Sequence, residues 1–216
     1  MRTLACLFLL PALHAQDLQA LVERLYPKKD DRMKEYKLPE IARQLAIQTG
    51  SRVADLGCGP GDFVIFLSHV VGPQGRVYAV DIDADTLKGA RGRFKKEKLR
   101  NVDAILGLPE NPKLPAGLDA ILSVRTYHEY EKLTEILAAV RAALKPGGVF
   151  VVVDQWPNRT RDRSREVQLK NHVLVPSLVE DDLKKAGFEI VHRADSFLDD
   201  ADKEEAQWLI AARPHP

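Results

Sequence analysis

Three glycines at alternate positions follow a short apolar segment that ends in an acid. They are Gly57, Gly59 and Gly61, the acid is Asp55, and residues 55–61 are called the glycine turn below. Glycine adopts positive φ, and without a Cβ it lets the backbone approach a ligand closely. Such turns bind nucleotides at the carboxyl ends of strands in open α/β sheets. The spacing G-x-G-x-G differs from the G-x-G-x-x-G of dinucleotide-binding folds, which argues against a nicotinamide dehydrogenase.

A second acid, Asp81, ends the next apolar segment, residues 77–81. A carboxylate at the tip of a second strand can accept hydrogen bonds from both hydroxyls of a ribose. The plainer alternative is an ordinary strand–helix–strand unit with an acid at its surface. The pair of acids and the glycine turn together favour a nucleoside-binding site.

The segments DLGCGPG (55–61) and VYAVDID (77–83) together resemble the class I S-adenosylmethionine-dependent methyltransferases. The resemblance extends from residue 32 to the C-terminus. It implies that Asp55 and the three glycines surround the methionine part of the cofactor S-adenosylmethionine. It also implies that Asp81 holds the ribose and that Ile82 packs on the adenine. The implied activity is transfer of a methyl group to a nucleophile.

The sequence departs from the family at Leu108. There the resemblance implies an acid that receives the adenine amino group, but a leucine side chain accepts no hydrogen bond. We therefore expect the adenine to meet the backbone amide of Leu108 and apolar side chains.

The candidate catalytic residues follow Ser123, which ends the fourth predicted strand and is expected beside the cofactor. The resemblance implies that this segment faces the reactive methyl group. His128 could then accept a proton from the nucleophile, and Glu129 could orient the ring or act as the base. Tyr127 could offer its ring face to the cationic sulfonium. Alternatively, His128 caps the following helix and Glu129 is a favourable acid in its first turn. No metal-ligand cluster is evident from the spacing.

From residue 52 onward, strand and helix patterns alternate, which predicts an α/β fold with a mostly parallel sheet. The resemblance implies a Rossmann-like methyltransferase fold of seven strands, with helices on both faces and an antiparallel C-terminal hairpin at the edge. The predicted strands are 52–56, 76–80, 103–106, 118–123, 149–154, 189–194 and 207–212. The predicted helices are 17–25, 39–48, 63–71, 85–98, 132–144 and 178–185. Residues 16–50 are interpreted as a helical cap, and 51–216 as the S-adenosylmethionine-binding methyltransferase domain.

The N-terminus has a basic start, a short apolar run at 3–10, and Pro11 before Ala15. This pattern is typical of a secretory signal peptide, residues 1–15, and predicts export to the periplasm or the medium. The apolar run is too short to span a bilayer. The alternative is a cytoplasmic protein with an apolar N-terminal helix.

The 216 residues carry a formal net charge of +1, so the total charge gives no reason to expect nucleic acid as a partner. Two cysteines provide no disulfide framework. A small-molecule methyl acceptor is therefore favoured. Methylation of a protein or RNA, and a non-catalytic module that binds S-adenosylmethionine or S-adenosylhomocysteine, are alternatives. The acceptor and the oligomeric state are open.

Overall fold

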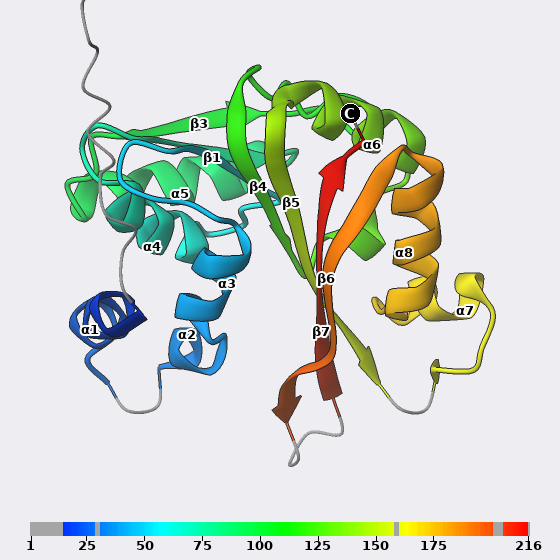
Figure 1. The fold of residues 1–216 in the computed structure, drawn as a ribbon. Coiled ribbons are helices and arrows are strands. Elements are labelled where there is room, and N and C mark those ends of the chain that lie inside the picture. The colour runs from blue at the N-terminus through cyan, green and yellow to red at the C-terminus, as the bar shows by residue number, and fades with distance from the viewer. Residues whose placement is uncertain (1–14, 29–30, 158–159, 201–204, 216) are drawn as a thin grey trace, which may run out of the picture.

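The computed structural model describes residues 15–28, 31–157, 160–200 and 205–215, and a seven-stranded sheet forms its centre (Figure 1). The strands are β1 (Arg52–Leu56), β2 (Arg76–Asp81), β3 (Val102–Leu106), β4 (Leu118–Val124), β5 (Leu144–Pro157), β6 (Phe188–Asp200) and β7 (Glu205–Pro214). Their order is β3-β2-β1-β4-β5-β7-β6. Strands β1 to β5 pair in parallel, whereas β7 pairs antiparallel with both β5 and β6. The predicted fold class and C-terminal edge hairpin are confirmed.

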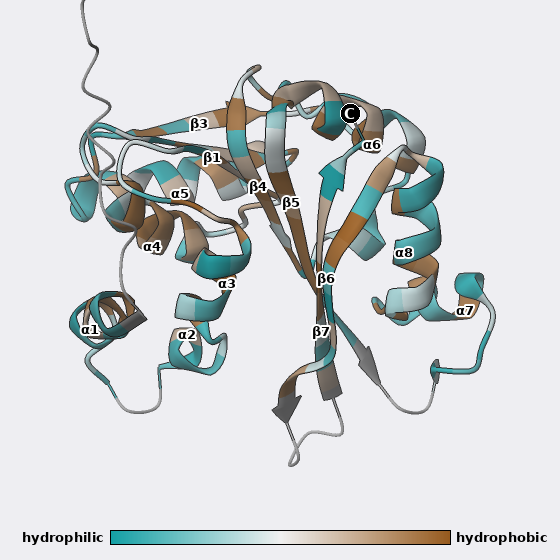
Figure 2. Ribbon diagram, viewed as in Figure 1, coloured by the Kyte–Doolittle hydropathy of each residue, from teal (hydrophilic) through white to brown (hydrophobic). Residues whose placement is uncertain are grey.

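Helices cover both faces of the sheet (Figure 1). They are α1 (Ala15–Leu25), α2 (Arg32–Glu35), α3 (Leu38–Gln44), α4 (Asp62–Val71), α5 (Ala84–Lys96), the 3-10 helix η1 (Tyr127–Glu129), α6 (Leu133–Ala143), α7 (Arg165–Lys170) and α8 (Pro176–Lys185). One apolar core joins α1 to α5 to one face, and a second joins α6 and α8 to the other. Because both faces are covered, β4 and β5 are apolar along most of their length, as Figure 2 shows.

Several element boundaries differ from the predicted ones. Helices α2 and α7 were not predicted, and α3 ends four residues before the predicted position 48. Strand β5 begins at Leu144, before the predicted start at residue 149, and its register with β4 shifts between Leu118 and Ala120. The first residues of β5 therefore form an irregularity inside the strand. The predicted signal peptide falls almost entirely on residues 1–14, which lie outside the described residues.

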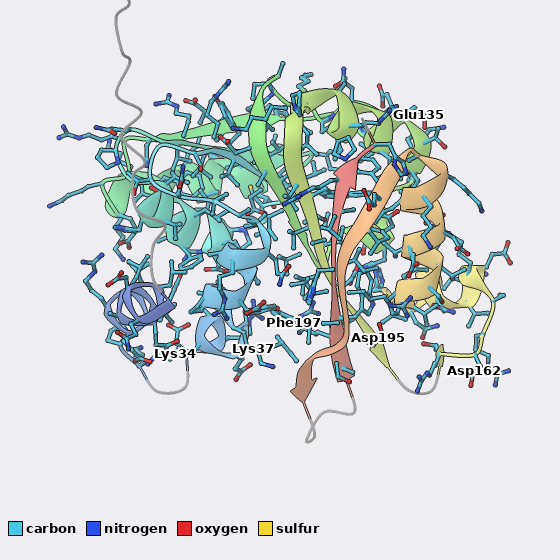
Figure 3. The ribbon with its side chains drawn as sticks, viewed as in Figure 1. Lys34, Lys37, Glu135, Asp162, Asp195 and Phe197 are labelled. Atoms are coloured by element: carbon cyan, nitrogen blue, oxygen red, sulfur yellow. The ribbon has the colours of Figure 1, made fainter. Side chains whose placement is uncertain are left out.

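The strand order reverses direction at β1, which has β2 on one side and β4 on the other. Ligands of open α/β sheets bind at such a switch point, beyond the carboxyl ends of the strands. The segment around α2 lies near this end and is tied to β6 by Lys37, whose ammonium donates to the Phe197 carbonyl at 2.6 Å (Figure 3). None of the helices in the described residues combines the length and apolar character needed to cross a bilayer.

Candidate functional site

A cavity of about 740 Å³ lies at the switch point, a volume within the range of small-molecule and cofactor sites. The glycine turn, the end of β2 and the α2 segment all contribute to its wall. Six residues predicted from the sequence line it: Gly57, Gly59, Asp81, Ile82, Leu108 and Glu129. Met33 and Tyr36 also line it and are buried, with 4% of each residue exposed. The structure thus brings the predicted nucleoside-binding residues together under the α2 segment.

The three glycines of the glycine turn are needed for different reasons. A Cβ added to Gly57 would lie 2.2 Å from the Thr126 side chain, and one added to Gly61 would lie 2.4 Å from the ring of Phe94. Both positions therefore require glycine for packing within the protein. Gly59 has a φ of 51°, and no atom lies within 4 Å of the position that a Cβ would take there. Since it lines the cavity, Gly59 is the glycine whose missing side chain leaves room for a ligand.

The Asp81 carboxylate is held at the mouth of the turn by two backbone amides. Its Oδ2 accepts from the Gly59 N–H at 2.9 Å, and its Oδ1 accepts from the Asp83 N–H at 3.0 Å. Each carboxylate oxygen has a second lone pair, so both can still accept a hydrogen bond from a ligand hydroxyl. The carboxylate therefore enters the cavity wall already oriented.

The predicted adenine contacts are partly corrected. Ile82 and Leu108 line the cavity with 61% and 42% of their surfaces exposed, and both can offer apolar contact. The backbone N–H of Leu108, however, donates to the carbonyl of Asn111 at 2.8 Å. This turn satisfies the amide internally, so the amide is not free for the adenine in this conformation.

Asp55 lies behind the glycine turn and does not line the cavity. Only 1% of the residue is exposed, and its Oδ2 has no hydrogen-bond partner among the described residues. Burial, together with the charges of Asp81 and Asp62, raises the pKa of Asp55 to about 8. A buried carboxyl with one oxygen that has no partner among the described residues is chemically suited to receive a cationic donor.

The predictions that Ser123 and Tyr127 lie at the cavity are corrected, because both side chains are buried away from it. Ser123 is fully buried, and its hydroxyl lies 2.9 Å from that of Tyr130, which lines the cavity in its place. Tyr127 is 2% exposed and packs in the core below α6 and α8, with its hydroxyl 3.4 Å from Asp182. The Tyr127 ring thus points away from the cavity, and Tyr130 is the aromatic residue of this segment at the site.

His128 does not line the cavity but lies directly behind Glu129. Its Nδ1 is 2.9 Å from each oxygen of the fully buried Asp154, and its Nε2 is 3.1 Å from Oε1 of Glu129. Burial alone would lower the pKa of His128, but the hydrogen bond and charge of Asp154, with those of Glu129, outweigh it and raise this pKa. A raised pKa favours the imidazolium, which cannot accept a proton. His128 is therefore less suited to act as a base than its position in the sequence indicated.

The sequence did not lead us to assign Asp154, Tyr130 or His172 to the site. The signal for Asp154 was present, because it is an acid that ends the apolar run of β5. His172 lies 43 residues from Glu129 in the chain, yet its Nδ1 is 2.6 Å from Oε1 of Glu129. Nothing in the spacing of these residues predicts that contact.

Comparison with known proteins gives consistent results. A family model described as "Methyltransferase domain" matches residues 47–212. A demethylmenaquinone methyltransferase of Geobacillus stearothermophilus is 28% identical over 119 residues, which are 53% of this chain and 50% of that protein. The chain thus spans about half the length of this curated relative.

Solved structures share the fold. One is a SAM-dependent methyltransferase from Aquifex aeolicus, with a TM-score of 0.71 and 21% identity over 93% of this chain and 98% of that one. Another is Aeropyrum pernix fibrillarin with natively bound S-adenosyl-L-methionine, with a TM-score of 0.57 and 20% identity over 76% of this chain and 67% of that one. At these identities the likeness concerns the fold.

Proposed function

The chain belongs to the family of methyltransferase domains, and from that premise we propose that it transfers a methyl group from S-adenosylmethionine to a small-molecule nucleophile. The observation that carries the proposal is the wall formed by Asp81 and Gly59. There an oriented carboxylate and an open backbone position face one cavity at the switch point of the sheet.

The residues present fit S-adenosylmethionine. Asp81 would accept hydrogen bonds from the two ribose hydroxyls, and Ile82 and Leu108 would contact the adenine. The backbone at Gly59 would approach the methionine part, whose ammonium group would pair with the unpartnered oxygen of Asp55. Binding of the cofactor would give a partner to this buried oxygen, which has none among the described residues.

The cofactor supplies an activated methyl group, because its sulfonium is a good leaving group. The protein then has to align the nucleophile with the methyl carbon and exclude water, and such alignment can account for much of the acceleration. Tyr36 and Met33 cover the cavity from the α2 segment, whereas Arg125, Glu129 and Tyr130 form the wall at the end of β4. The acceptor is proposed to lie between these two groups.

Two observations favour a small acceptor. Met33 and Tyr36 of the α2 segment form part of the cavity wall, and a wall on this side would hinder access of a folded protein or RNA to the methyl group. The Geobacillus relative is named for a small-molecule acceptor, demethylmenaquinone. We therefore propose a small-molecule acceptor.

Binding of the cofactor is tested by calorimetry on the full chain with S-adenosylmethionine and S-adenosylhomocysteine. Asp81→Asn removes the charge that holds the ribose, and we expect its affinity for both ligands to fall about 10- to 100-fold. Asp83→Asn is the matched control, because Asp83 caps α5 through Thr86 and does not line the cavity. Unchanged binding to Asp81→Asn would remove the basis of the proposal.

Catalysis is tested separately with labelled S-adenosylmethionine and a metabolite extract, by following release of S-adenosylhomocysteine. We expect label to appear in a small metabolite. Tight cofactor binding without transfer to any fraction would instead favour the non-catalytic binding module.

A further inference from the structure

Three potential metal ligands meet at the rim of the cavity: His128, Glu129 and His172. Oε1 of Glu129 lies 3.1 Å from Nε2 of His128 and 2.6 Å from Nδ1 of His172. The three ligand atoms all lie within 4.8 Å of one another. Ligands bound to one zinc ion at about 2.1 Å in a tetrahedral arrangement are separated by roughly 3.4 Å. The observed separations are close enough that small side-chain movements would complete such a site.

The histidine at the base of this cluster is held in the orientation that a metal requires. Asp154 is fully buried and both of its oxygens lie 2.9 Å from Nδ1 of His128. If the carboxylate accepts the Nδ1 hydrogen, the lone pair of the neutral ring is on Nε2, directed at Glu129. A carboxylate that fixes the tautomer of a histidine in this way is common behind metal ligands.

The segment that carries His172 is also fixed by contacts outside the cluster. The side-chain oxygen of the buried Gln168 accepts from the N–H of Val175 at 2.8 Å. The indole of Trp208 donates to the carbonyl of Leu174 at 2.7 Å. His172 itself is 69% exposed at its side chain, so its ring is held near Glu129 by a well-anchored backbone and remains accessible to solvent.

The close contacts between nitrogen and oxygen in the cluster need either a ring hydrogen or a metal ion between the facing atoms. An imidazole nitrogen with its lone pair exposed would be repelled by the Glu129 carboxylate at 3.1 Å, and the same holds for His172 at 2.6 Å. Either protons or a metal ion must therefore lie between these atoms. Two imidazoles and one carboxylate are a common ligand set for Zn²⁺ in sites that keep a further coordination position open.

We propose that His128, Glu129 and His172 bind a divalent transition-metal ion of the Zn²⁺ type, with its open position toward the cavity. Glu129 belongs both to the cluster and to the cavity wall, so the ion would lie at the cavity's margin. Asp154 would be a positioning residue that acts through His128. Metal binding stands on the cluster alone, whereas its role in catalysis rests on the proposed methyl transfer.

That role would be to bind the nucleophile of the acceptor. A hydroxyl or thiol that coordinates the ion releases its proton to water more readily, because the positive charge stabilises the anion. The anion then forms a bond to the methyl carbon, the bond from that carbon to sulfur breaks, and its electron pair remains on sulfur. In this reaction the imidazole of His128 is a ligand rather than a base.

The test measures metal binding directly. The full chain is stripped with a chelator, and Zn²⁺ is titrated in competition with a chromophoric chelator, while Co²⁺ is used to record the visible absorption of a bound ion. We expect one Zn²⁺ per chain and a Co²⁺ spectrum typical of four or five ligands. His172→Gln and Glu129→Gln alter exposed side chains, so both should fold, and each should weaken binding about 100-fold or more. Asp154→Asn should weaken it about 10- to 100-fold.

Two matched controls keep the test specific. Glu131→Gln changes an exposed acid that also lines the cavity, and His215→Gln changes an exposed histidine outside the cluster; neither should alter Zn²⁺ affinity. The inference is wrong if the wild-type chain shows no saturable Zn²⁺ or Co²⁺ binding, or if His172→Gln and Glu129→Gln bind as tightly as the wild type. Cofactor affinity is measured on the same samples. A chain that binds S-adenosylmethionine without metal contradicts only this inference, and one that binds metal without the cofactor contradicts only the proposed function.

Discussion

Asp55 gives the most direct quantitative test of the site. The residue is 1% exposed, one carboxyl oxygen has no partner among the described residues, and the pKa of the carboxyl is raised to about 8. In an unfolded chain the pKa of an aspartate is about 3.9. The proton therefore binds about 10⁴-fold more tightly in the folded protein, which corresponds to about 5 kcal/mol. Above pH 8 the ionised carboxylate lowers the free energy of unfolding of the ligand-free protein by an amount of this order.

The direction of the pH dependence follows from proton binding. Between about pH 4 and pH 8 the folded protein holds a proton on Asp55 that the unfolded chain has lost, so the free energy of unfolding falls as the pH rises. Asp55→Asn keeps the shape of the side chain and removes the titration. We expect the stability of the wild type relative to Asp55→Asn to fall by about 1.4 kcal/mol per pH unit from pH 5.5 to pH 7.5.

Urea unfolding of both proteins at several pH values measures this difference. Ser123→Ala is the control, because it alters another fully buried polar side chain of the sheet. Neither serine nor alanine titrates, so the effect of this substitution should not depend on pH. If the difference in free energy of unfolding between the wild type and Asp55→Asn stays constant with pH, Asp55 is not an uncompensated buried acid. Calorimetry adds a second readout: at pH 7, binding of S-adenosylmethionine should release up to one proton from the wild type and none from Asp55→Asn.

Two further predictions concern the glycine turn and the N-terminus. Gly57→Ala should destabilise the protein by about 2–4 kcal/mol, because its Cβ would lie 2.2 Å from Thr126 in a backbone conformation unfavourable for alanine. Gly59→Ala should cost only about 1 kcal/mol of stability in urea unfolding and should instead weaken cofactor binding, since its Cβ enters the open cavity. If Gly59→Ala lost more stability than Gly57→Ala, the assignment of Gly57 to packing and of Gly59 to ligand space would be wrong. Mass spectrometry of the native protein should find an N-terminus at Gln16, whereas an intact Met1 form in the cytoplasm would contradict export.

The sheet was predictable from the sequence because burial on both faces leaves a clear pattern. The run 149–153 is uniformly apolar, and such a run is typical of a parallel strand that is covered on both faces. The short helices were not predictable on the same grounds. Helix α2 has four residues and one buried side chain, Met33, so it is stabilised by packing near the cavity and has no periodicity to detect.

Site residues that lie at the ends of strands could be predicted from the sequence. Whether a side chain points into the cavity could not. Asp81 ends β2 and Gly59 follows the neighbouring strand β1, so their proximity follows from the topology alone. Ser123 and Tyr127 also lie close to a strand end, but the turn into η1 directs Tyr130 to the cavity and buries the other two. The contact of Glu129 with His172 depends on a segment anchored by Gln168 and Trp208, which no local pattern encodes.

Two places in the site have polar groups that a bound cation could complete. At Asp55 a buried carboxyl oxygen lacks a donor among the described residues, and at Glu129 a carboxylate oxygen faces two imidazole nitrogens, with either ring hydrogens or a metal ion between them. Both lie at or directly behind the wall of the same cavity. Natural proteins tend to break local rules of polar pairing at functional sites and stabilise the fold elsewhere. Here the two apolar cores stabilise the sheet, so that a cationic cofactor and a metal ion can each complete one of these arrangements on binding.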